Sequence, residues 1–226
     1  GGDSISLYLS FAKTTQVVGY GAIGGSETSG LFRSNHDLLR ETSRNVEIGY
    51  ALDRLQWSLD SAVFYRWDDD LVDWSYTGAG ARAAENMDVE TFGLEIIAAR
   101  YWNRVEAIVS YSYLKKDEEY RNPGVIGSFY ALNFPEHRAT MGLIYTPSEL
   151  FEVRIDNEWR DHRESSLRTG PTHAVFSHVG LSCYPTRSDE LEVFFAFDKP
   201  WDDDFQEIPG TPGRSDQFSL GVSCRW

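Results

Sequence analysis

Two runs of aspartate are the strongest candidates for metal chemistry in this sequence. Asp68-Asp69-Asp70 and Asp202-Asp203-Asp204 each place three carboxylates side by side. Carboxylate oxygens are the ligands that Ca²⁺ prefers, so either run could hold this ion. Neither run has the spaced ligands of a dedicated calcium loop, and clustered acidic side chains are usually solvated. We therefore expect no cofactor, with Ca²⁺ in the acidic loops as the alternative.

Hydrolysis is a second chemistry that these residues could support. Some outer-membrane proteases use Asp and His side chains at the rim of a barrel, and the candidates here are Asp68, Asp69 and Asp70 with His162 or His173. The five histidines are scattered and form no recognisable constellation, so we expect no enzyme. The glycines at 19, 21 and 24 mimic a dinucleotide-binding fingerprint without its strand and helix, which indicates a flexible loop.

Large aromatic side chains in the predicted loops are the candidates for ligand contact. They are Tyr20, Phe32, Trp74, Tyr130 and Trp201. Aromatic rings offer a large apolar surface to a bound molecule, but they pack equally well against one another. Contact with a ligand and packing among the loops are therefore both open.

Composition limits the partners and the kind of membrane segment. The 226 residues carry 21 Lys and Arg against 35 Asp and Glu, a formal net charge of −14, which argues against nucleic acid as a partner. No stretch approaches the ~20 consecutive apolar residues of a spanning helix, so a membrane location would require a β-barrel. Cys183 and Cys224 are too few for a disulfide scaffold, and we expect both on apolar strand walls without a bridge.

Alternation of apolar and polar residues is the main structural signal. It occurs in the segments 5–12, 45–52, 57–67, 91–98, 105–113, 138–145, 151–160, 175–183, 191–198 and 217–226. Such alternation predicts strands with one apolar wall and one polar wall. The segments have about 8–11 residues, which is closer to the strands of membrane barrels than to those of soluble sheets with about 5–6.

The predicted connections alternate between long and short. Long loops are expected at 13–42, 68–87, 115–135, 164–172 and 199–214, and tight turns near residues 53, 102, 148 and 187. Outer-membrane barrels have this asymmetry, with short periplasmic turns and longer extracellular loops. Aromatic residues at the ends of the apolar walls fit the interfacial girdles of such barrels. The many charged residues on the polar walls predict a wide lumen that holds water or a polar plug.

The final segment carries a further signal. Its pattern Ser219-x-Gly221-x-x-Cys224-x-Trp226 resembles the C-terminal signal of bacterial outer-membrane barrels, in which a polar residue and a glycine precede two apolar residues. This resemblance implies that the barrel-assembly machinery is a partner.

Three other motifs resemble TonB-dependent outer-membrane receptors. Residues 35–50, NHDLLRETSRNVEIGY, resemble the family's N-x-x-L-x-x-E followed by a strand reading E-hydrophobic-G. Residues 62–67, AVFYRW, resemble the next strand, and 133–139, NFPEHRA, resemble the N-x-P-x-H-x-A motif before a late strand. The resemblance implies an all-β fold. Residues 1–226 would be a single fragment, about ten C-terminal strands of a transmembrane antiparallel β-barrel of about 22 strands.

The resemblance also implies a function and partners. Receptors of this family lie in the outer membrane of Gram-negative bacteria and import scarce nutrients, such as ferric siderophores or cobalamin. The expected partners are outer-membrane lipid, the missing plug and N-terminal barrel strands, and the TonB complex through that plug. Nothing here resembles the plug or the segment that engages TonB, so no TonB contact is predicted.

Two other architectures fit part of the pattern. A complete ten-stranded barrel, acting as a porin or a rim protease, would have the even strand number that closure requires. A soluble β-sandwich also shows alternation, but it leaves the asymmetry between turns and loops unexplained.

Overall fold

The chain folds into one sheet, described in a computed structural model over residues 3–78, 80–128, 133–165, 168–186, 190–202, 204–209 and 211–225. Its long strands pair antiparallel in the order β1-β3-β4-β5-β6-β8-β9-β10-β11-β12. They are β1 (Ser4–Gln16), β3 (Glu41–Arg54), β4 (Trp57–Tyr76), β5 (Arg82–Trp102), β6 (Val105–Tyr120), β8 (Pro135–Ser148), β9 (Phe151–His162), β10 (His173–Cys183), β11 (Leu191–Pro200) and β12 (Gln217–Cys224). The prediction of an all-β antiparallel fold is confirmed.

Short strands and a short helix lie beside the long strands of this sheet. The two-residue strand β2 (Phe32–Arg33) pairs parallel with β5, and β7 (Gly127–Ser128) pairs antiparallel with β4. The helix α1 (Tyr20–Ile23) has four residues. Across the described ranges, no helix has the length and apolar character needed to cross a membrane.

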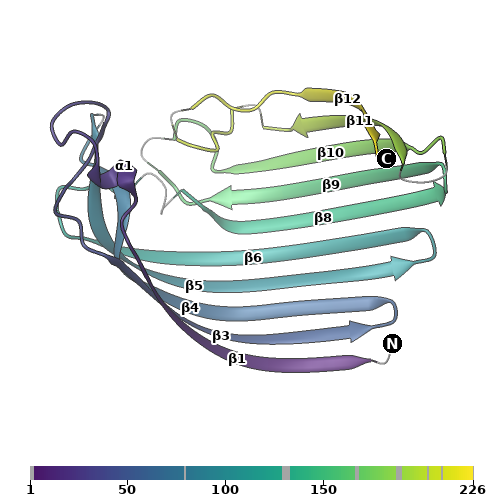
Figure 1. Ribbon diagram of the computed structural model, residues 1–226, viewed down its shortest axis with the longest axis horizontal. Helices are drawn as coiled ribbons and strands as arrows, with labels where there is room; N and C mark the ends of the chain where they lie inside the picture. The colour runs from purple at the N-terminus through teal and green to yellow at the C-terminus, as the bar shows by residue number, and fades with distance from the viewer. Residues whose placement is uncertain are drawn as a thin grey trace.

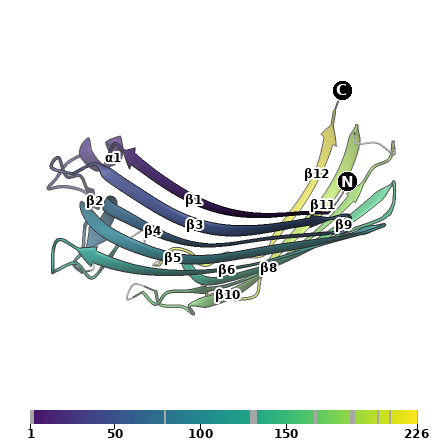
Figure 2. The same cartoon turned by 90° about the horizontal axis from the view of Figure 1, so that it is seen from below.

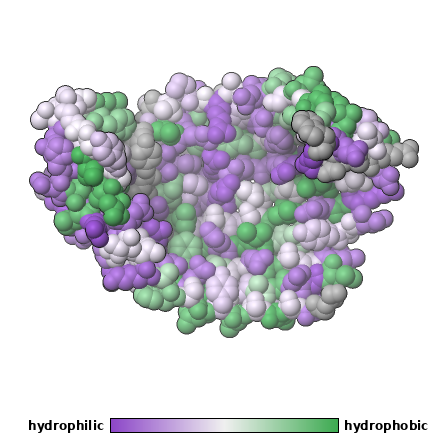
Figure 3. All heavy atoms as spheres, viewed as in Figure 1, coloured by the Kyte–Doolittle hydropathy of each residue, from purple (hydrophilic) through white to green (hydrophobic). Residues whose placement is uncertain are grey.

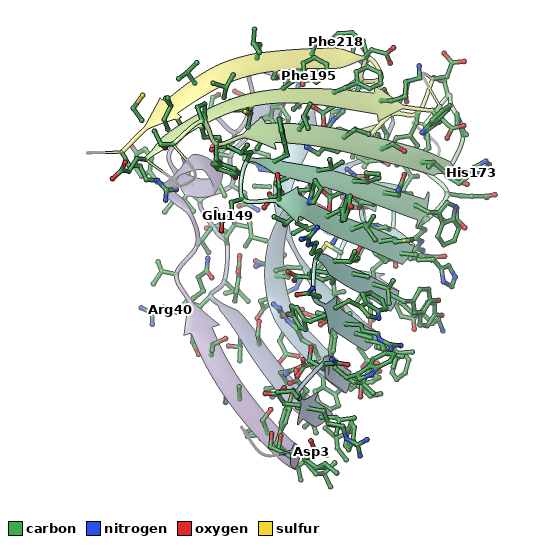
Figure 4. All side chains as sticks on the ribbon, turned by 90° about the vertical axis from the view of Figure 1, so that its right-hand side faces the viewer. Asp3, Arg40, Glu149, His173, Phe195 and Phe218 are labelled. Atoms are coloured by element: carbon green, nitrogen blue, oxygen red, sulfur yellow. The ribbon has the colours of Figure 1, made fainter. Side chains whose placement is uncertain are left out.

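The sheet is bent into an open trough (Figure 1, Figure 2). β1 and β12 form its two edges, and within the described residues neither pairs with a strand on its outer side. Figure 4 shows Asp3 at one end of the arc and Phe218 at the other. Each edge therefore offers a row of backbone N–H and C=O groups to a further strand.

The two walls predicted from alternation are confirmed. Residues of the apolar wall face one another across the strands, as in Leu9 opposite Ile48 and Ile48 opposite Val63. This wall is the convex one, from which Phe195 and Phe218 project (Figure 4), and its side chains stay open, with Leu9 75% exposed. Figure 3 looks into the hollow, whose middle carries hydrophilic side chains. An exposed apolar wall of this extent is suited to lipid.

Turns and loops lie at opposite ends of the strands (Figure 1). Two-residue turns join β3 to β4, β5 to β6 and β8 to β9, at 55–56, 103–104 and 149–150. We call this the turn end and the opposite one the loop end. The predicted turns near 53, 102 and 148 and the asymmetry of the described connections are thereby confirmed, whereas the turn predicted near 187 lies outside the described residues.

One predicted loop is wrong. Residues 68–87 belong mostly to β4 and β5, which continue past the other strands as a long hairpin. The segment before β3 packs on this hairpin and stabilises it, because Val18 and Ala22 are buried against Ala84, with Trp74 beside them. Other residues that were predicted as loop also lie in the long strands, at 13–16, 41–42, 115–120, 135 and 199–200.

A bulge marks the point where the hairpin leaves the main sheet. The pairing of β4 with β5 shifts register between Asp68 and Leu71, and Asp70 has a φ of 59°. This left-handed conformation is tolerated by Asp better than by most residues with a Cβ. The Asp70 amide donates to Asp88 Oδ1 at 2.9 Å, and its carbonyl accepts a bond from Asn86 Nδ2 at 2.7 Å. The bulge is therefore held from both sides.

Candidate functional site

A charged network covers the concave wall of β8 and β9 near the loop end. Glu158 Oε1 accepts hydrogen bonds from Arg138 Nε and from Arg160 Nε, each at 2.5 Å. The three residues meet because Arg138 and Arg160 are direct cross-strand partners and Glu158 lies two positions before Arg160, on the same wall. Two guanidinium groups on one carboxylate leave cationic surface for a further anionic group.

That further group comes from the segment between β11 and β12. Glu207 Oε1 lies 2.9 Å from Arg160 Nη1, and Glu207 Oε2 lies 2.8 Å from Arg214 Nη2. Both guanidinium groups also lie over the ring of Phe176, with Cζ 5.0 Å away for Arg160 and 5.9 Å for Arg214. Cation–π contacts of this kind strengthen as water is excluded. The two arginines and Phe176 border a cavity of about 420 Å³, which His178 and Asp198 also line.

A packed cluster of loop residues lies beside this cavity. Phe205 is only 2% exposed, and its ring centroid lies 5.3 Å from that of His162 and 5.8 Å from that of Phe176. Arg168 lies over Phe205 at 5.2 Å and donates to the carbonyl of Gln206. The connections after β9 and β11 therefore form one body that contacts the cavity.

Burial in this cluster changes the chemistry of His162. The residue lies three positions beyond Trp159, outside the apolar belt, and is 7% exposed. Burial, with the neighbouring charges of Arg168 and Arg160, lowers the pKa of His162 to about 4. His162 is therefore neutral near pH 7 and acts in packing rather than as a cation.

The first aspartate run is divided among three environments. The buried Asp68 accepts hydrogen bonds from Ser43 and Arg66, whereas Asp69 pairs with Arg44 at 2.8 Å and Asp70 with Arg121. The run forms strand and bulge instead of the predicted loop, so its alternating side chains diverge.

The second run is equally dispersed. Asp202 Oδ2 accepts the backbone N–H of Val175 at 3.0 Å, Asp204 lies beside Gly170, and Asp203 lies outside the described residues. In the part of the chain that the structure describes, no group of three or more His, Cys, Asp or Glu side chains could hold a metal ion. Calcium binding stays an untested prediction.

The predicted ligand-contacting aromatics fall in separate places. Phe32 and Trp74 meet edge to face at 5.1 Å. Tyr20 is 82% exposed on α1, and Trp201 is 62% exposed at the end of β11, where its Nε1 donates to Ser177 Oγ at 2.9 Å. Tyr130 lies outside the described residues. The structure thus brings one pair together, and ligand contact stays a prediction for all five.

The hydrolase candidates do not meet. β5, β6 and β8 separate β4, which carries Asp68, Asp69 and Asp70, from β9 and β10, which carry His162 and His173. Of the residues in the C-terminal signal, Ser219 and Gly221 face the trough, Cys224 faces outward, and Trp226 lies outside the described residues. Cys183 and Cys224 are both free thiols.

The part of the cavity border that comes from the connection between β11 and β12 was not predicted from the sequence. Alternation placed Arg138, Glu158 and Arg160 on the polar wall, and the structure brings them together. Glu207 and Arg214 lie in an irregular connection, where no periodicity indicates which strand they contact. The sequence of this connection carries no signal that would have found them.

Comparisons with known proteins give the family of this sheet. The family model described as TonB dependent receptor-like, beta-barrel, matches residues 2–182. The FrpB iron transporter from Neisseria meningitidis is similar at 18% identity and a TM-score of 0.69, over 98% of this chain and 37% of that chain. The copper transporter OprC is similar at 11% identity and a TM-score of 0.69, over 96% of this chain and 36% of that chain. No curated protein matches the chain.

A liganded receptor has the same fold. A mutant of the ferric enterobactin receptor from Pseudomonas aeruginosa, in complex with enterobactin, is similar at 13% identity and a TM-score of 0.66. The match covers 97% of this chain and 38% of that one, so the chain spans little more than a third of such a structure. Receptors of this family are proteins of the Gram-negative outer membrane that bind and transport, which agrees with the expectation of no enzyme. The family model covers most of the sequence, and the chain belongs to the family of TonB-dependent receptor β-barrels.

Proposed function

We propose that this chain is the C-terminal part of the barrel of an outer-membrane receptor that imports a ferric siderophore with energy from TonB. The observation that carries the proposal is the sheet, whose ten long strands combine an apolar convex wall, a charged concave wall and two open edges. A barrel of about 22 strands would supply the missing neighbours of β1 and β12. The solved structures that it resembles include transporters of iron and of copper.

The charges of the cavity favour a ferric siderophore over cobalamin. Arg160 and Arg214 flank Phe176 and share Glu207, which sits on a connection rather than on a strand. An anionic chelate could displace the Glu207 carboxylate and take over its bonds to both guanidinium groups. Cobalamin offers these groups less negative charge, and the similar structures include a ferric-catecholate import receptor and a ferric enterobactin receptor.

The proposed partners follow from the family. They are outer-membrane lipid around the convex wall, a plug and N-terminal strands from the rest of the polypeptide, the TonB complex through that plug, and the barrel-assembly machinery. Location of this chain in the outer membrane of a Gram-negative bacterium is part of the proposal. Fractionation of cells that express the complete receptor should recover it with the outer membrane.

Uptake by the complete receptor tests the ligand class. We expect a labelled ferric siderophore to enter an iron-limited strain only when both the receptor and TonB are present. Replacing both arginines, Arg160→Gln with Arg214→Gln, should weaken ferric siderophore binding about tenfold or more, since two charge-assisted contacts are lost. Arg54→Gln, at the turn end, is the control that should bind normally. TonB-independent uptake, or uptake of cobalamin alone, would contradict the proposal.

A complete ten-stranded porin or rim protease is less well supported. Within the described residues β1 and β12 do not pair, so this sheet does not close on itself. The aspartates and histidines that a protease would need lie on strands that are not neighbours. Neither observation favours the alternative.

A further inference from the structure

An arginine on the apolar wall is held between two tryptophans. The guanidinium Cζ of Arg100 lies 4.3 Å from the ring centroid of Trp57 and 4.7 Å from that of Trp102. Trp57 is the direct cross-strand partner of Arg100, and Trp102 follows it on the same wall. All three side chains therefore lie on the convex wall at the turn end, beside the turns 55–56 and 103–104.

Within the described part of the chain, this guanidinium has no hydrogen-bond acceptor. Among the described residues Arg100 makes no hydrogen bond or ion pair, and its Nε is buried without a partner. Arg54, the cross-strand partner of Trp57, is already paired with Asp3 at 3.4 Å, and Ala107, opposite Arg100 on β6, has no polar side-chain atom. The two rings orient the guanidinium through cation–π contacts and leave its charge uncompensated.

An uncompensated arginine on a lipid-facing wall needs an anion. Such a residue is most costly near the midplane of a bilayer, and the cost falls toward the interface, where headgroups can pair with it. Arg100 lies at the interface end of its strand, between tryptophans that are 45% and 44% exposed and suited to the headgroup level. The anions abundant at that level are phosphates of lipid headgroups, and guanidinium groups bind phosphate in bidentate fashion.

We propose that Trp57, Arg100 and Trp102 form a binding site for the phosphate of an anionic phospholipid in the leaflet at the turn end. The headgroup phosphate meets the Nη donors of Arg100, while the acyl chains lie along the apolar wall beyond the two rings. This inference rests on the proposed membrane location of the barrel. The site holds one phospholipid specifically, in addition to the freely exchanging lipids that surround any membrane barrel.

The test uses the complete receptor in vesicles of phosphatidylethanolamine that contain a minority of phosphatidylglycerol with brominated acyl chains. Bromine quenches tryptophan fluorescence on contact, so quenching reports occupancy beside Trp57 and Trp102. We expect Arg100→Gln to need about five- to tenfold more brominated lipid for half-maximal quenching. Arg54→Gln, whose side chain is already paired with Asp3, should behave as the unmodified receptor.

The outcomes separate the two proposals. Equal quenching of the Arg100→Gln variant and the unmodified receptor overturns the lipid site and leaves the barrel intact. Equal affinity for brominated phosphatidylglycerol and brominated phosphatidylethanolamine overturns the selectivity for an anionic lipid. No quenching of any variant means that the wall does not face lipid, which contradicts the proposed membrane location itself.

Discussion

Phe194 covers Gly221 on the concave wall. The two residues are direct cross-strand partners on β11 and β12, and a Cβ built on Gly221 would clash with the end of the Phe194 ring. The glycine of the C-terminal signal therefore provides the space in which an aromatic ring of the neighbouring strand lies. Such a pairing compensates the missing side chain of glycine by packing across the strands.

Gly221→Ala should destabilise the final hairpin by about 1–3 kcal/mol, because the added methyl group displaces the Phe194 ring. The measurement is the denaturant midpoint of the complete receptor, followed by heat-modifiable migration in gels. Gly21→Ala is the matched control, since nothing lies within 4 Å of a Cβ there. Combining Gly221→Ala with Phe194→Leu should recover part of the loss, and an unchanged midpoint for Gly221→Ala alone would contradict this account.

The same arrangement occurs at two other pairs of long strands. Tyr8 covers Gly49 between β1 and β3, and Phe64 covers Gly93 between β4 and β5. Gly49 is the glycine of the E-hydrophobic-G motif. A glycine that the family motif contains is therefore also the one against which the Tyr8 ring packs. A sequence shows the glycine and the aromatic but not that they are opposite each other, because the register depends on turn lengths and bulges.

The sequence predicted the walls better than the loops, for a physical reason. Alternation is a local property of each strand, so the ten strands and their two walls could be read from the residues. The β4–β5 hairpin could not, because its polar aspartates resemble a loop and its stability comes from distant residues such as Val18 and Ala22. Part of the cavity border was missed likewise, since Arg214 reaches it from an irregular connection, as does Glu207, its ion-pair partner.

The Asp70 bulge should accept glycine and reject a β-branched residue. Asp70→Gly keeps the left-handed conformation, whereas Asp70→Val should cost about 1–3 kcal/mol, because φ > 0 is strained for valine. Hydrogen exchange of amides 71–87 measures the effect, since the bulge anchors the hairpin to the sheet. Asp69→Val is the neighbouring control, and faster exchange in that variant than in Asp70→Val would count against a conformational cause.

Removing the buried ring of Phe205 should release the loop cluster. Phe205→Ala deletes contacts to His162, Phe176 and Arg168, and truncating a buried Phe typically costs about 3–5 kcal/mol. Limited proteolysis should then cut within residues 163–172 or 204–209, while the strands stay protected. Trp201→Ala, at an exposed neighbour, should leave the cleavage pattern unchanged. Cleavage within β9 or β10 in the Phe205→Ala variant would mean that the ring supports the sheet rather than the loops.

Acid should open the same cluster through His162. Its pKa is lowered from 6.5 to about 4 by burial, so the open form binds a proton more readily than the packed form. Stability of the packed cluster is therefore full above pH 6.5, falls as the pH drops through the window between the two values, and levels off below about 4. The shift corresponds to about 3 kcal/mol in total.

Hydrogen exchange in the cluster residues 163–165, 168–172 and 204–209 should accelerate as the pH falls from 7 to 4.5, after correction for the intrinsic rate. His162→Phe should remove this dependence, and His173→Phe, at an exposed site, should retain it. The same acid response in the His162→Phe variant would assign it to another group.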